Sequence, residues 1–118
     1  PKLKAGVAEA EAMERMARAD LDAMKLMAVS QAVEARELVV AARAEVLLLD
    51  AEVIPRARVA VDAALAGYQA GQGTLITVIE AARTLWEVRA ELVMAESALS
   101  DAWARLSRAT GQSLGAIQ

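Results

Sequence analysis

The feature that most constrains this chain is a pair of long segments that contain no helix-breaking residue. Neither Gly nor Pro occurs from Val7 to Ile54 or from Thr74 to Thr110, and both segments consist mostly of residues with high helix propensity. Within each segment apolar residues recur at steps of three and four, the spacing of a helix that packs lengthwise against another helix. The sequence therefore predicts an all-α fold built from two long helices.

The longer segment carries two apolar stripes. The first, the contact seam, comprises Leu21, Met24, Ala28, Ala32, Ala35, Val39, Ala42, Val46, Leu49 and Val53. The second recurs every seven residues and comprises Leu26, Val33, Val40, Leu47, Ile54, Val61 and Tyr68. The shorter segment has a seam between Val78 and Leu106, with an adjacent set of Ile79, Trp86 and Val93. A helix with two apolar stripes needs a neighbouring helix on each side. We therefore expect other chains, or further parts of a longer protein, to cover the apolar surface that these two helices leave exposed.

The chain is predicted to reverse at its one glycine cluster, which lies between the two segments. Gly71 and Gly73 can adopt positive φ at little steric cost. We therefore expect a helix over about 4–70, a tip turn over about 70–74 and a second helix over about 74–110, packed antiparallel as a long coiled-coil-like hairpin. Folding at this turn places Thr110 beside Glu34, so the first part of the longer helix has no partner within the chain.

Smaller signals mark the ends of these helices. Thr74 or Thr77 is expected to cap the second helix, and Thr77 with Glu80 fits a capping box. Gly111 is expected to end that helix. Pro55 removes one backbone donor from the first helix, and we expect a kink or local bulge there, with a complete break as the alternative.

Composition excludes several classes of function. The chain contains no Cys and no His, which excludes a disulfide scaffold, a Cys/His zinc site and catalysis by either side chain. Its net charge of −3 and scattered basic residues give no indication of nucleic-acid binding. No enzyme, cofactor or metal site is predicted. Met13, Met16, Met24 and Met27 have soft sulfur ligands suited to Cu(I), but gap filling along a helical seam is the favoured interpretation.

A composite of short motifs resembles the C-terminal repeat of TolC-like outer-membrane efflux proteins. The matching elements, at the spacing of that family, are Ile54-Pro55, the run 67–71 that contains Tyr68, the run 75–85 with its acidic-Ala pair Glu80-Ala81, and Leu106 followed by Gly111. The resemblance covers about 54–111 well, whereas residues 1–53 match in helical character and length. Each motif is weak by itself, and their common spacing gives the composite its specificity.

The resemblance implies a fold and a location. Family members are trimers with a β-barrel in the outer membrane and a long α-helical barrel that crosses the periplasm. This chain would be a periplasmic hairpin of the α-barrel, from a Gram-negative outer-membrane protein. The β-barrel and the other repeat would lie outside it, and membrane contact would occur only through that β-barrel. The implied partners are a periplasmic adaptor (membrane fusion) protein, an inner-membrane pump and two further copies in a homotrimer.

The resemblance also assigns roles to residues at the turn. Docking on the adaptor would use Gln69, Gly71, Gln72, Gly73 and Thr74, although the glycines could equally serve the turn alone. The gate or constriction would involve Tyr68, Thr77 and Glu80, with edge packing as the alternative for Tyr68. Gly73 replaces a basic residue of the best-studied member, and Thr77 replaces one of its two acidic pore residues. A complete ring of charges at the gate is therefore not carried over to this chain by the resemblance.

Two functions from different classes follow from these observations. The first is a wall and tip segment of an export channel in a tripartite efflux pump. The second is a self-associating coiled-coil interaction module, such as the hairpin of a periplasmic adaptor protein. The tip motif favours the channel. The exported substrate and the class of inner-membrane pump are not encoded in these residues.

Overall fold

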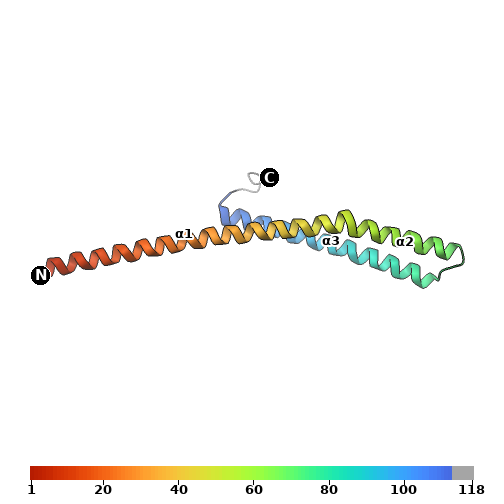
Figure 1. The fold of residues 1–118 in the computed structure, drawn as a ribbon, viewed down its shortest axis with the longest axis horizontal. Coiled ribbons are helices and arrows are strands. Elements are labelled where there is room, and N and C mark those ends of the chain that lie inside the picture. Colours follow the sequence, from red (N-terminus) through yellow and green to blue (C-terminus); the bar gives the residue numbers. More distant parts are fainter. Residues whose placement is uncertain (113–118) are drawn as a thin grey trace.

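Two helical rods of unequal length, lying side by side in opposite directions, make up the computed structural model, which describes residues 1–112 (Figure 1). The long rod consists of α1 (Lys2–Leu48), a π-helical turn η1 (Leu49–Val53) and α2 (Ile54–Gln69). The short rod is α3 (Leu75–Thr110). The molecule measures 102 × 27 × 14 Å, so it is one helix thick. The prediction of an all-α helical hairpin is confirmed.

The two rods are joined by a narrow apolar seam with two clusters. One cluster contains Ala35 and Val39 of α1 with Ala102 and Leu106 of α3, and half-buried Ala109 packs against it. The other contains Leu49, Ile54, Val88 and Ala95. Ala35 thus lies in the same cluster as Ala109, the register expected from folding at the glycine cluster. Alanine at so many contact positions lets the helix axes approach closely.

Charged side chains contribute little to the joining of the rods. Within residues 1–112, each ion pair links near neighbours along one rod, as in Arg18–Glu14 at 2.5 Å and Arg83–Glu87 at 2.8 Å. Pairs of this kind stabilise a helix slightly but do not connect two helices. The seam is therefore held by apolar contact alone.

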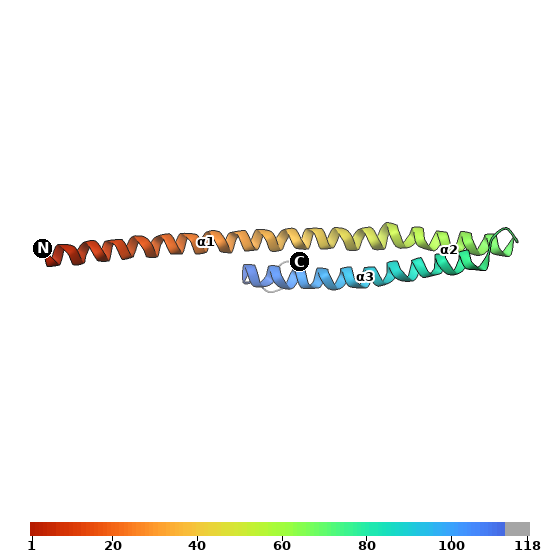
Figure 2. The same cartoon turned by 90° about the horizontal axis from the view of Figure 1, so that it is seen from below.

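The first part of α1 projects beyond the hairpin as a single helix, called here the arm and defined as residues 1–31. Figure 2 shows that no other helix among residues 1–112 runs beside it. Ala12 is the one residue of the arm that is even partly buried. The apolar side chains of Leu3, Met16 and Leu26 are 88%, 67% and 72% exposed. Met24, expected on the seam, is 66% exposed because α3 ends before reaching it.

A π-helical turn immediately precedes Pro55. The backbone N–H of Ile54 donates to the carbonyl of Leu49, five residues earlier, and helical conformation continues on both sides. The structure thus has a local bulge and no break. A π turn widens the helix locally, which makes room for the proline ring and its missing donor.

The bulge changes the course of the seven-residue stripe. Before the π turn Val33, Val40 and Leu47 are 53%, 51% and 56% exposed. After it, Ile54 is buried at 6% and Val61 is half-buried. The expectation of one stripe along one face is therefore wrong, because the extra residue in the π turn rotates the following helix.

Helix capping follows the predictions in part. Thr74 is the N-cap of α3, and its hydroxyl oxygen accepts a hydrogen bond from the backbone N–H of Thr77 at 3.3 Å. The Thr77–Glu80 capping box is wrong, because α3 begins at Leu75 and Thr77 already lies in its first turn. Gly111 ends α3 with φ 67°, as expected. No helix of the described part of the chain has a stretch sufficiently long and apolar to cross a bilayer.

Candidate functional site

The tip turn between α2 and α3 is built from backbone hydrogen bonds. Gly71 has φ +73°, and its N–H donates to the carbonyl of Tyr68 at 3.0 Å. The N–H groups of Gln72 and Gly73 both donate to the carbonyl of Gly67, at 2.9 and 3.0 Å. The bonds from Gly71 and Gln72 form a Schellman motif, which satisfies the last carbonyls of α2. The turn is therefore a defined structure.

Two of the glycines are required by this geometry. Gly71 adopts a left-handed conformation that costs other residues about 1–2 kcal/mol. A Cβ on Gly73 would lie 3.2 Å from the backbone nitrogen of Tyr68 and 3.3 Å from the carbonyl carbon of Gly67. Both contacts are with backbone, which cannot swing away. The glycines predicted for docking thus have a structural role in the turn itself.

The tip presents neutral polar groups to solvent. Gln69, Gln72 and Thr74 are exposed, and so is every residue from Tyr68 to Thr77. No charged side chain occurs between Asp62 and Glu80. Leu75 and Ile76, at the start of α3, add apolar side chains that are 53% and 67% exposed. A surface of this kind can bind a partner through backbone groups, amides and apolar contacts.

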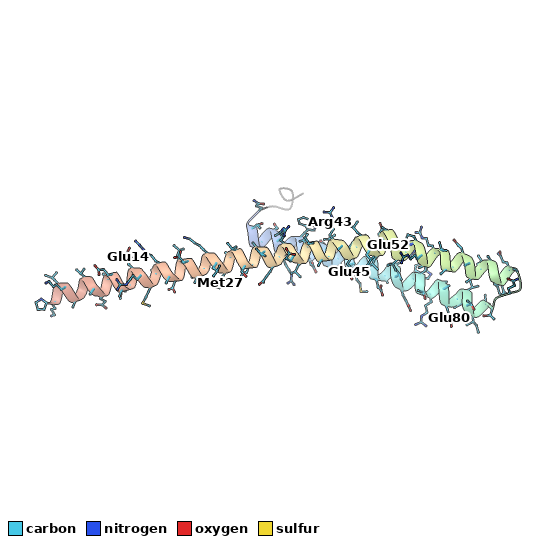
Figure 3. The ribbon with its side chains drawn as sticks, viewed as in Figure 1. Glu14, Met27, Arg43, Glu45, Glu52 and Glu80 are labelled. Carbon is cyan, nitrogen blue, oxygen red and sulfur yellow. The ribbon has the colours of Figure 1, made fainter. Side chains whose placement is uncertain are left out.

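The three residues predicted to line a gate lie near the tip but are not joined by hydrogen bonds. Tyr68 is 45% exposed at the end of α2. The hydroxyl of Thr77 lies 3.0 Å from that of Thr74, which couples Thr77 to the cap. Glu80 projects from α3 one turn further on (Figure 3), and its backbone carbonyl accepts a bond from the Thr84 hydroxyl. Glu80 is the one carboxylate of the three.

One face of the hairpin contains two shallow grooves between α1 and α3. The groove nearer the arm is lined by Gln31, Glu34, Ala35, Leu38, Arg105, Arg108 and Ala109. The next is lined by Leu38, Ala41, Ala42, Glu45, Ala98, Asp101, Ala102 and Arg105. Several of these residues precede a seam residue by one position, as Leu38 precedes Val39 and Arg105 precedes Leu106. On both helices, the residues one position before a seam residue therefore lie on the same face of the hairpin.

The opposite face carries an apolar band. Its members are more than half exposed and comprise Val33, Val40 and Leu47 of α1 with Ile79, Trp86 and Val93 of α3. Most of them follow a seam residue by one position, a rotation of about 100° away from the seam. Because the helices are antiparallel, this offset brings residues of both helices to the face opposite the grooves. The guanidinium of Arg89 lies over the Trp86 ring, 5.6 Å from its centroid. In the sequence, the only signal of this stacking is the spacing of three residues between Trp86 and Arg89.

The methionines give no support to a metal site. Met13, Met16, Met24 and Met27 lie on the arm and are 58–67% exposed. In Figure 3 Met27 projects from the isolated part of α1, away from any other element. Within residues 1–112, no three His, Cys, Asp or Glu side chains gather in a geometry that could hold a metal ion.

These features define a class of protein, a long helical hairpin whose exposed apolar band and arm are suited to pack against other helices. The family of outer membrane efflux proteins matches residues 1–112, and the chain belongs to that family. It is part of an outer-membrane efflux protein, a transport component from a family that is not one of enzymes. Comparisons with curated proteins and with solved structures gave no match. The resemblance noted from the tip motifs is thus confirmed.

Proposed function

We propose that this chain forms part of the periplasmic wall of an outer-membrane export channel, and that its tip docks on a periplasmic adaptor protein in a tripartite efflux pump. The observation that carries the proposal is the surplus of exposed apolar surface at defined places. The arm, the apolar band and the tip each present side chains that this chain leaves uncovered. Apolar surface of that extent marks contact with other protein.

A wall of parallel rods accounts for the position of this surface. In a homotrimeric channel, the band provides a lateral contact for a neighbouring hairpin. The arm provides a contact for another helix of the same protein, stacked on the end of α3. Burial of a Leu or Met side chain contributes about 1.5–3 kcal/mol, so covering the arm would stabilise the assembly considerably.

Docking at the tip is supported by its shape and its lack of charge. The Schellman turn holds Gln69, Gln72 and Thr74 at the end of the hairpin where α2 and α3 meet, opposite to the arm. Tyr68, Thr77 and Glu80 would line the constriction just inside it. With Thr77 in place of a second carboxylate, closure of the entrance would depend on packing and neutral hydrogen bonds more than on charge.

A substitution at the turn tests docking without altering the backbone. Gln72→Trp adds bulk to an exposed side chain and should weaken capture of the full-length protein by its periplasmic adaptor at least tenfold, about 1.4 kcal/mol, by steric exclusion. The measurement is the equilibrium affinity for purified candidate adaptors, together with export by cells. Ser97→Trp, at an exposed position far from the tip, is the matched control and should leave capture unchanged. Capture of the Gln72→Trp protein at full affinity would contradict docking at this turn.

The absence of charge at the tip gives a second test. Contact through neutral groups should be almost independent of ionic strength, so the affinity for the adaptor should vary by less than about twofold between low and high salt. A steep decrease with salt would place the adaptor contact on the charged faces of α3 instead.

A further inference from the structure

The contact seam of the long rod has one irregular step. From Ala32 to Leu49 the partly or fully buried residues follow one another at intervals of three and four. The next fully buried residue is Ile54, five positions after Leu49, and its half-buried neighbour Val53 packs against the same cluster. Beyond it the half-buried residues Ala57, Val61 and Ala64 resume the regular spacing. At the end of η1 the seam therefore contains two adjacent residues, and beyond them it continues one position later than regular spacing would place it.

A regular α-helix with the same sequence would bring a different set of residues to α3. Regular steps continued from Leu49 would select Val53, Arg56, Ala60 and Ala63. Arg56 has a side chain that is 80% exposed and paired with Glu52 at 3.1 Å, and burying it in the seam would be costly. Val61 would turn outward by about 100°. The observed arrangement keeps Arg56 in solvent and Val61 against α3.

The backbone of η1 provides the physical means. The bond from the Ile54 N–H to the Leu49 carbonyl spans five residues and so takes one more residue into the turn than an α-helix does. Pro55 follows directly and has no N–H to continue a regular ladder, which favours the irregular turn at this place. Both Leu49 and Ile54 remain in one buried cluster, with Val88 and Ala95.

We propose that η1, held in place by Pro55, is the positioning element that sets the rotation of α2 about its axis, and with it the orientation of the tip turn. It does so by taking one more residue into the turn than a regular α-helix would. The rotation should therefore depend on the number of residues between Leu49 and Ile54. Removal of one residue yields a regular four-residue step and keeps Ala57 and Val61 against α3, whereas addition of one brings Ala60 and Ala63 there instead.

A length series with single cysteines tests this inference in the full-length protein. The chain has no cysteine, so each introduced thiol is unique within it. Ala57→Cys and Val61→Cys report the contact side, and Ala60→Cys and Ala63→Cys report the solvent side. The parent protein should show slow maleimide labelling at the first pair and fast labelling at the second. Deletion of Ala51 should keep this pattern, and insertion of one alanine after Asp50 should exchange the two pairs.

Deletion of Asp50 and Ala51 together is the matched control. It leaves one residue too few between Leu49 and Ile54 for a regular step of four, and should therefore expose Ala57 and Val61. Circular dichroism verifies that each variant is helical. Fast labelling at Val61→Cys after the single deletion, or an unchanged pattern after the insertion, would overturn the inference. The labelling does not depend on export or on an adaptor, so its outcome is separate from that of the proposed function.

Discussion

The arm and the first part of the hairpin belong to the same helix, α1, yet they differ in burial. Both are rich in Ala and contain further apolar residues at helical spacing, with charged residues between them. Ala35 and Val39 are 6% and 5% exposed because α3 lies beside them, while Leu26, three turns earlier, is 72% exposed. Residue type and helix propensity do not decide which apolar side chain is buried. An apolar side chain of α1 is buried only where α3 lies beside it.

The largest expected effect comes from removing a seam residue. Leu106→Ala should destabilise the hairpin by about 2–5 kcal/mol, because it leaves a cavity between α1 and α3. Leu26→Ala, on the arm, should change the stability of this chain by less than about 0.5 kcal/mol. Urea unfolding followed by circular dichroism measures both. If Leu26→Ala proves equally costly in the full-length protein, the arm is covered there.

The glycines provide a smaller contrast between the same two regions. Gly71→Ala should cost about 1–2 kcal/mol, since alanine is strained at φ +73°. Gly6→Ala should instead stabilise the arm by about 0.5–1 kcal/mol, because Gly6 is helical and a Cβ there meets no other atom. Thermal melting of the two variants should shift in opposite directions. A melting temperature of Gly71→Ala that is unchanged or raised would show that Gly71 is not held in its left-handed conformation.

The helix starts differ as well. Thr74→Ala removes the hydroxyl that caps α3 and should cost about 1 kcal/mol. The start of α1, after Pro1, has no side-chain cap to lose. Thr84→Ala is the matched control, because its hydroxyl bonds to the Glu80 carbonyl within α3 and alanine has the higher helix propensity. Hydrogen exchange of the first turn of α3 should accelerate in Thr74→Ala and not in Thr84→Ala.

Salt is expected to have the smallest effect. The ion pairs of the described residues lie along single rods, with side chains that are at least half exposed. Screening them should shift the melting temperature of the hairpin very little. The arm depends more on such pairs and should lose some helicity at high salt. Melting that changes steeply with salt would indicate a charge contact between the rods.

Much of this fold could be predicted from the sequence because its signals are local and repetitive. The two long helices, the reversal at the glycine cluster, the register that brings Ala35 near Ala109 and the stop at Gly111 all follow from spacing and propensity. The rotation at η1 could not be predicted. Val53 lies four residues after Leu49, and Ile54 lies seven residues after Leu47. Both spacings are regular, so a repeat count alone does not show which of the two neighbours is the more deeply buried.

The candidate site was predictable in position but not in mechanism. The glycine motif located the tip, and its hydrogen bonds then explained why Gly71 and Gly73 are needed there. The Thr77–Glu80 capping box failed because the start of α3 is fixed by the turn geometry and not by the best motif match. The Trp86–Arg89 stack depends on side-chain rotamers, which a sequence does not display.

The smallest dimension of the molecule, 14 Å, has a consequence for how such a protein can vary. A layer that is one helix thick has no core in which a side chain is surrounded on all sides by the same chain. Nearly all of the described positions border either the other rod or the surroundings of the molecule. Whether a substitution in this chain is tolerated therefore depends more on what surrounds the chain than on its own packing.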